Sequence, residues 1–275
     1  MDPRDAPKID CHCHVIDPAR FPYRADTAYR PAGQEVAPLE TLLRTLDGHG
    51  VRHALIVGTN SGYDRDLSPM LDALERGEGR FRGVAVVDRG IGTAELAALK
   101  RRGIAGIAFN ATFQGVEPYI GAGDLLRRMA DLDLFLQLQV RDDQLLALRP
   151  LLEASPARLV VDHCGRPDLD QGLDGAAFRA LLELGRAGRA MVKLSGYDKF
   201  SRERHPYADT RPYTDALVAA FGDACLWGSD WPFLRAPERI DYAPLIDLAA
   251  AIVPDPRARA RLFWDTPRRL LGFPA

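Results

Sequence analysis

Two histidines separated by one residue, His12 and His14, end an apolar run near the start of the sequence. The run Ile9-Asp10-Cys11-His12-Cys13-His14 predicts a short buried strand, and alternate residues of a strand point to the same side. His12 and His14 should therefore project together, while Cys11 and Cys13 face the other way. Two neighbouring imidazoles can bind a metal, polarise a carbonyl or form hydrogen bonds within a core, and the motif alone leaves these interpretations open.

His163 and Asp230 are two further ionisable residues at the ends of apolar runs. His163 follows Leu-Val-Val-Asp, and Asp230 precedes Trp231-Pro232. Burial of such groups without a partner is costly, so they must be paired or functional, and we predict that both act in a site. Asp162 precedes His163 by one residue. Strand alternation then predicts that its side chain faces away from the site and anchors a loop or helix.

Eight short apolar runs alternate with segments of helical periodicity along the whole chain. The predicted strands are 8–16, 51–58, 81–88, 103–110, 134–140, 157–163, 190–196 and 224–230. The predicted helices include 38–49, 92–102, 120–133, 142–153, 172–188, 208–221, 237–252 and 256–270. Apolar strands separated by helices indicate a parallel sheet that is covered by helices. Eight such units in roughly 250 residues favour an α/β fold with one domain over residues 1–275, a (β/α)₈ or TIM barrel.

The carboxyl ends of the strands meet at one mouth of such a barrel, where its active sites lie. Polar residues gather after the predicted strands, and we expect them to converge there; they are Thr59, Ser61, Asn110, Gln137, Gln139, Arg141, Arg166, Lys193 and Ser195. Two long irregular segments, 17–38 and 197–213, follow strands and predict binding loops. His49 and His53 lie at the opposite end and are interpreted as structural, whereas the role of His205 stays open.

The composition limits the classes of partner. The 275 residues carry a net charge of -2, and no apolar run approaches the roughly 20 residues of a membrane span. We therefore expect no nucleic acid and no membrane as partner, but a small-molecule substrate. The four cysteines form no CxxC pair and the first residues lack the order of a secretory signal, so we expect a cytoplasmic protein. The sequence leaves open whether it forms a homo-oligomer.

Six motifs, in their order along the chain, resemble those of the amidohydrolase superfamily and, within it, of amidohydrolase-related family 2. The nearest branch holds 2-pyrone-4,6-dicarboxylate lactonases, L-fuconolactonases and 4-sulfomuconolactone hydrolases. The motifs extend from the first predicted strand to the last predicted helix: DCHCHV (10–15), FPY (21–23), DHCGRPD (162–168), VKLSG (192–196), WGSDWP (227–232) and TPRRLLGF (266–273).

This resemblance implies a hydrolase that opens a small lactone, either a sugar lactone or a muconolactone or pyrone-type ring ester. Asp230 matches the carboxylate that takes a proton from the attacking water, and His12, His14 and His163 match the histidines around the carbonyl. Arg166 matches a receptor for a substrate carboxylate. Further candidates for substrate contact, by family position or by place at the barrel mouth, are Tyr29, Thr59, Ser61, Asn110, Gln139, Lys199 and Trp231.

The chain departs from parts of the family pattern. Members with two metals place a lysine or glutamate on the fourth strand and histidines on the fifth and sixth, where this chain has Asn110 and Gln139. We therefore predict no binuclear centre and no required cofactor; the alternative is one Zn²⁺ held by His12, His14, His163 and Asp230. The pyrone-dicarboxylate lactonases carry an Arg-Phe-Asn-x-x-x-Arg pattern. Segment 108–114 lacks both arginines, and Lys199 replaces a third, which favours a substrate with fewer charges.

Two other functions stay open from the sequence. One is a zinc-dependent decarboxylase, or another metal-dependent amidohydrolase, of the same superfamily; the related aminocarboxymuconate-semialdehyde enzymes need a histidine where Gln139 stands. The other is a barrel that has lost catalysis and only binds. The presence of Asp230, His163 and both N-terminal histidines argues against it.

Overall fold

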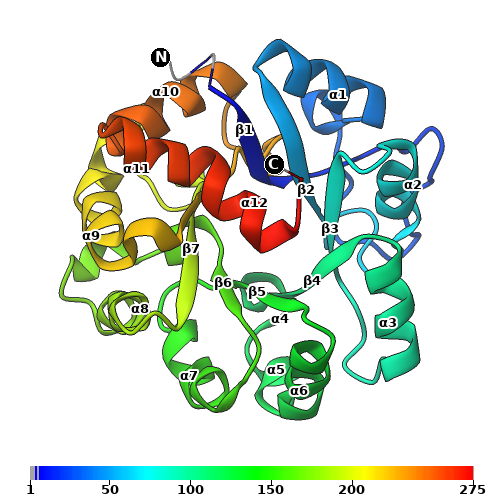
Figure 1. Ribbon diagram of the computed structural model, residues 1–275, viewed down its shortest axis with the longest axis horizontal. Helices are drawn as coiled ribbons and strands as arrows, with labels where there is room; N and C mark the ends of the chain where they lie inside the picture. The colour runs from blue at the N-terminus through cyan, green and yellow to red at the C-terminus, as the bar shows by residue number, and fades with distance from the viewer. Residues whose placement is uncertain (1–3, 5, 275) are drawn as a thin grey trace.

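Eight parallel strands lie side by side in chain order in the computed structural model, which describes residue 4 and residues 6–274 (Figure 1). They are β1 (Lys8–Cys13), β2 (Val51–Val57), β3 (Phe81–Ala85), β4 (Ile104–Asn110), β5 (Phe135–Gln139), β6 (Leu159–Val161), β7 (Ala190–Leu194) and β8 (Cys225–Trp227). A parallel bridge between Cys13 and Trp231 joins the ends of β1 and β8. The predicted (β/α)₈ barrel is confirmed.

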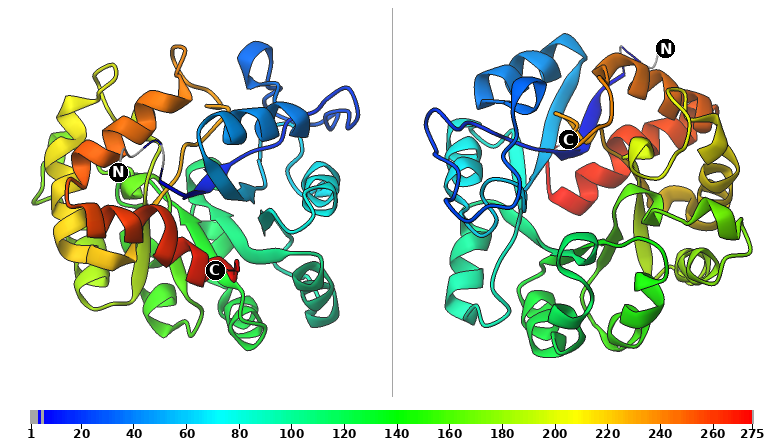
Figure 2. Two further views of the ribbon diagram at one scale, coloured as in Figure 1. Left: turned by 45° about the horizontal axis from the view of Figure 1, so that its top comes forward. Right: turned by 180° about the vertical axis from the view of Figure 1, so that it is seen from behind.

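Helices surround the strands (Figures 1 and 2). They are α1 (Leu39–Gly48), α2 (Ser68–Arg76), α3 (Thr93–Arg101), α4 (Ala111–Gln114), α5 (Glu117–Ile120), α6 (Gly123–Asp131), α7 (Gln144–Ala154), α8 (Ala176–Arg186), α9 (Arg211–Phe221), α10 (Tyr242–Ile252), α11 (Pro256–Ala260) and α12 (Thr266–Leu271). Helix α2 lies between β2 and β3, where no range for the helix had been named from the sequence. The predicted helix 256–270 is divided by a π-helical turn, Arg261–Asp265. Among the described residues, no helix is long and apolar enough to cross a membrane.

The core has two parts that the strands separate. Alternate strand residues pack with the outer helices, while the others form an interior cluster with Leu270, Leu271 and Phe273 from the chain's end. Helix α12 lies across one end of the barrel (Figure 1), so it covers this interior cluster. The segments that follow the strands lie at the opposite end (Figure 2, right). The residues that line the main cavity belong to the ends of the strands and to these segments.

The register of β1 against β2 shifts between Asp10 and Cys13, as in a β-bulge. As a result, Cys11 packs in the interior cluster and Cys13 in the outer one. The prediction that both cysteines face the same way was therefore wrong, because simple alternation does not allow for an extra residue. The shift still leaves both His12 and His14 at the barrel mouth.

A buried carboxylate, Asp10, ties β1 to the segment that follows β8. Its oxygens accept hydrogen bonds from the Ser229 backbone N–H at 2.9 Å, the Ser229 hydroxyl at 2.6 Å and the Tyr242 hydroxyl at 2.7 Å. The His12 backbone N–H donates to it at 3.0 Å. Asp10 therefore fixes where the chain leaves the barrel after β8.

We expect Asp10→Ala to lower the free energy of unfolding by about 3 kcal/mol or more, since each buried donor left unpaired costs about 1–3 kcal/mol. Urea denaturation monitored by circular dichroism measures this. The matched control is Asp255→Ala at the exposed start of α11, where loss of the cap to the Ala258 N–H costs about 1 kcal/mol. Equal losses in the two variants would contradict the role of Asp10.

Candidate active site

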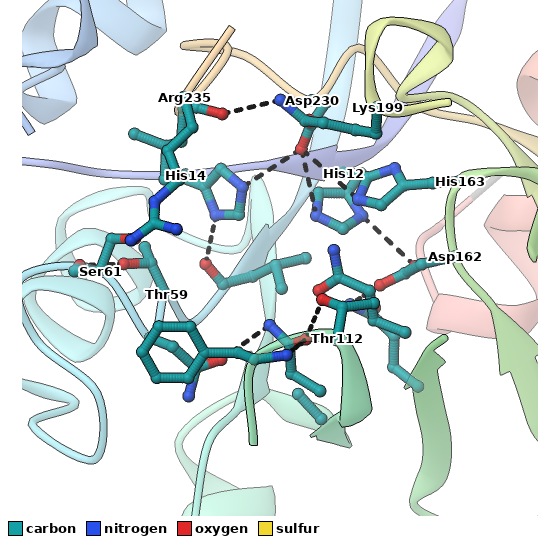
Figure 3. Close-up of a pocket in the computed structure, with 18 of the residues that line it drawn as sticks. His12, His14, Thr59, Ser61, Thr112, Asp162, His163, Lys199, Asp230 and Arg235 are labelled. Atoms are coloured by element: carbon teal, nitrogen blue, oxygen red, sulfur yellow. Dashed lines mark hydrogen bonds and ion pairs between the residues drawn. The ribbon is translucent and has the colours of Figure 1, made fainter. Parts of the chain in front are cut away.

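A cavity of about 450 Å³ opens at the carboxyl ends of the strands (Figure 3). Most of the residues that the sequence predicted for a site line it: His12, His14, Thr59, Ser61, Asn110, Gln139, His163, Arg166, Lys199 and Asp230. Tyr29 and Trp231 are absent from the described lining. Trp231 acts there through its backbone, because its carbonyl accepts a hydrogen bond from the His14 N–H at 2.9 Å. Trp227, in contrast, is a fully buried core residue.

Three imidazoles converge on one oxygen of Asp230 (Figure 3). Asp230 Oδ1 lies 3.5 Å from His12 Nε2, 3.4 Å from His14 Nε2 and 3.8 Å from His163 Nε2. The backbone of Asp230 is left-handed, with φ 63°, and its N–H donates to the His12 carbonyl at 2.8 Å. This turn directs the carboxylate toward the histidines, and it explains why β8 ends earlier than predicted.

Gly228 allows β8 to approach His12 closely. A Cβ atom at this position would lie 2.7 Å from the His12 Cβ, which is closer than real Cβ atoms approach. Any side chain here would push His12 away from Asp230.

The carboxyl of Asp230 is held in its charged form. Burial alone would raise its pKa, but His163, Lys199 and a hydrogen bond from His14 together hold the pKa well below its usual range. Asp230 is therefore an ionised, buried carboxylate that can accept a proton from water.

Lys199 is bound by groups of the protein itself. Its ammonium lies 2.8 Å from Asp198 Oδ2 and 3.4 Å from Asp230 Oδ2, and it donates to the Leu234 carbonyl at 2.7 Å. Burial would lower the pKa of Lys199, whereas Asp230 and Asp198 raise it above the usual value. Although Lys199 lines the cavity, its contacts hold Asp230 in place.

Asp162 faces into the site, so the prediction that it faces away was wrong. β6 ends at Val161, and alternation from Val160, which packs in the interior cluster, carries Asp162 inward. His163 also reaches the cavity because its backbone is left-handed, with φ 50°. The carboxylate of Asp162 lies 3.4 Å from His12 Nδ1 and 3.0 Å from the ammonium of Lys193.

Two sets of buried residues bring ligand atoms within 4.8 Å of one another: His12, His14 and Asp230, and His12, Asp162 and His163. His14 is oriented like a metal ligand, since its Nδ1 faces the Val57 carbonyl oxygen at 2.8 Å while its Nε2 faces the cavity, 3.4 Å from Asp230 Oδ1. His12 belongs to both sets, yet its Nδ1 faces the Lys193 ammonium at 3.2 Å. An ammonium only donates, so this contact favours a neutral His12 that carries its hydrogen on Nε2.

Two arginines that line the cavity, Arg166 and Arg235, have no carboxylate as an ion-pair partner among the described residues. Nε of Arg166 is also buried without a hydrogen bond. Burial lowers the pKa of Arg166, although nearby acids oppose this effect. Arg235 enters the cavity on the side of Thr59 and Ser61 (Figure 3).

Sequence reasoning had not assigned Arg235 to the site. It lies in an irregular segment with φ 59°, its N–H donates to Glu35 at 2.6 Å, and its guanidinium stacks on the Tyr29 ring at 4.4 Å. No periodic pattern predicts such a position. Gln137 and Arg141 also line the cavity, and Lys193 contacts Gln137 from behind it. All three had been noted at strand ends in the sequence without being assigned to the site. Inward alternation on β5 and β7 could have predicted the positions of Gln137 and Lys193.

Comparisons with known proteins cover nearly the whole chain. The family model described as amidohydrolase matches residues 9–273. A 4-sulfomuconolactone hydrolase of Rhizobium radiobacter is 32% identical, covering 96% of this chain and 89% of that protein. A 2-pyrone-4,6-dicarboxylate hydrolase of Comamonas testosteroni is 31% identical, covering 95% and 89%. The crystal structure of a probable 2-pyrone-4,6-dicarboxylic acid hydrolase from Acinetobacter baumannii, with citric acid bound, superposes with a TM-score of 0.86 at 25% identity over 97% of this chain and 99% of that one.

We expect Asp162→Asn to lower the free energy of unfolding by about 3–5 kcal/mol at pH 7, because Lys193 keeps its buried charge and loses its partner. In the folded protein Lys193 and His12 outweigh burial and lower the pKa of Asp162, so its stabilisation is present above the unfolded pKa of about 3.9 and is lost as pH falls below it. Urea denaturation from pH 7 to pH 3 should show the difference between wild type and variant shrinking. A constant difference would contradict the pairing.

Proposed function

The chain belongs to the amidohydrolase family, and from this premise we propose that it hydrolyses the ring ester of a small lactone. The observation that carries the proposal is the convergence of three imidazole Nε2 atoms on Asp230 Oδ1, at 3.4–3.8 Å. A base for water and donors for a carbonyl oxygen are then adjacent, as ester hydrolysis requires. The curated relatives, which are hydrolases of ring esters by name, support the same class of reaction.

The proposed reaction needs only water and the side chains of the site. Asp230 takes a proton from water while the oxygen attacks the lactone carbonyl. The negative charge that develops on the carbonyl oxygen is stabilised by hydrogen bonds from the histidines, with His12 Nε2–H as one donor. The ring C–O bond then breaks, and the proton held by Asp230 passes to the leaving oxygen, which gives the hydroxy acid.

The substrate is proposed to carry acidic groups. Arg166 and Arg235 face the cavity without a carboxylate partner among the described residues, and a bidentate guanidinium suits a carboxylate or sulfonate. The missing arginines of segment 108–114 had favoured a less charged lactone. Because Arg235 adds a second cation from another loop, we propose an anionic lactone of the muconolactone or pyrone type over a neutral sugar lactone.

No metal is needed for this mechanism. The contact between His12 and Lys193 disfavours His12 as a zinc ligand, and the remaining steps use proton transfer and hydrogen bonds. The decarboxylase alternative depends on zinc, so it is the weaker proposal.

Replacing the base tests the reaction. We expect Asp230→Asn to lower kcat by a factor of about 10²–10⁴ on any lactone that the wild type hydrolyses, because an amide cannot accept the proton. A pH-indicator assay over muconolactones, pyrone dicarboxylates and sugar lactones measures this. Asp255→Asn, at the exposed cap of α11, is the matched control and should retain wild-type rates. If the wild type hydrolyses no lactone of the panel, with or without added Zn²⁺, the proposal fails.

Replacing the two arginines tests the substrate class. We expect Arg166→Gln and Arg235→Gln each to raise KM for anionic lactones at least tenfold, since each removes a guanidinium that binds an acidic group. Neutral lactones should be affected less than threefold. Arg239→Gln, a change at an exposed arginine paired with Asp241, is the control. An equal loss on neutral and anionic lactones would contradict the assignment.

A further inference from the structure

Lys193 is a fully buried lysine on β7, directly beneath the histidines of the cavity. Its ammonium lies 2.6 Å from Gln137 Oε1, 3.0 Å from Asp162 Oδ1 and 3.2 Å from His12 Nδ1. The contacts with Gln137 and His12 are hydrogen bonds, and Asp162 forms an ion pair with the ammonium. Lys193 does not line the cavity itself, so any effect on a substrate must pass through a neighbour.

Gln137 and Asp162 hold this ammonium in one orientation. The amide nitrogen of Gln137 donates to Asp162 Oδ2 at 2.8 Å, which leaves its oxygen to accept from Lys193. Asp162 supplies the opposite charge that a buried ammonium requires. The remaining acceptor of Lys193 is therefore His12 Nδ1.

The contact determines where His12 carries its hydrogen. A hydrogen on Nδ1 would point at the ammonium 3.2 Å away, donor against donor. The competing acceptor for a hydrogen on Nδ1, Asp162 Oδ1, is more distant, at 3.4 Å. A neutral ring has one hydrogen to place, and the contact with Lys193 favours Nε2 over Nδ1.

His14 has the opposite arrangement, since its Nδ1 faces the Val57 carbonyl oxygen at 2.8 Å and must donate. The Nδ1 of His14 thus faces an acceptor, whereas the Nδ1 of His12 faces a donor, and the Nε2 of His14 lies 3.4 Å from Asp230 Oδ1. Neighbouring histidines thus differ in the chemistry that they offer.

We propose that Lys193 is a positioning residue that holds His12 as the Nε2–H tautomer, which makes His12 a hydrogen-bond donor to the reacting oxygen and prevents Nε2 from binding a divalent metal. The role of this hydrogen in catalysis rests on the proposed lactone hydrolysis. The tautomer and the metal preference do not, because both can be measured without a substrate.

The tautomer is tested by ¹⁵N NMR of the histidine side chains, with the His12 signals identified by their loss in His12→Asn. The wild type should show a protonated Nε2 and an unprotonated Nδ1. Lys193→Met removes the donor, so the hydrogen should move to Nδ1 and face Asp162. Lys193→Gln keeps a donor and should retain the wild-type tautomer. A wild-type spectrum with hydrogen on Nδ1 overturns the proposal even if neither variant folds.

The metal preference is tested by equilibrium dialysis against Zn²⁺. We expect Lys193→Met to bind zinc at least tenfold more tightly than the wild type, and the added substitution His12→Asn to abolish the gain. In the lactone assay, Lys193→Met should lower kcat at least tenfold with little change in KM, and Lys193→Gln should restore part of the rate. Equal zinc affinity in wild type and Lys193→Met, or equal rates in the Met and Gln variants, would show that Lys193 is merely structural. A wild type with the expected tautomer but no lactone hydrolysis would refute the proposed function alone.

Discussion

The closure of the barrel between β1 and β8 is the constraint on which the rest of the site depends. Asp10 holds Ser229 and Tyr242 by buried hydrogen bonds, and two backbone hydrogen bonds continue the junction beyond it. Asp230 follows Ser229 directly, so the hydrogen bonds between Asp10 on β1 and Ser229 also fix the position of the proposed base. The histidines of β1 and the carboxylate after β8 are more than two hundred residues apart in sequence, yet they share one short stretch of hydrogen-bonded backbone.

The charges at the floor of the cavity divide into two linked groups. Asp162 and Lys193 neutralise each other below His12, while Asp230 is balanced by Lys199 and the imidazoles above it. Each buried acid therefore has a cation, and neither lysine is left to bind substrate. The cations that remain for a substrate are the arginines, so the proposal of an anionic ligand is compatible with three acids in the cavity.

The sequence allowed the barrel, its eight strands and the convergence of His12, His14, His163 and Asp230 to be predicted, because these follow from periodicity and from the common direction of parallel strands. It failed where the backbone leaves regular geometry. The bulge in β1 changed the side to which Cys11 points, and the left-handed backbone at His163 turned that side chain into the cavity beside Asp162, which regular alternation directs inward. Arg235 depends on contacts with Glu35 and Tyr29, two hundred residues away, which no local pattern encodes.

The residues that could be predicted and those that could not lie in different parts of the site, the floor and the rim of the cavity. The floor, with Asp230, the histidines and Lys193, is built on strands or on the first residues after them, where the core restricts each side chain to one direction. The rim, with Arg235 and the loop that carries Tyr29 and Glu35, is built from irregular segments that contact each other. Changes in the rim can alter which lactone binds without disturbing the Lys193–His12 contact below. Because cations reach the cavity from several loops, Arg235 can supply a positive charge that segment 108–114 lacks.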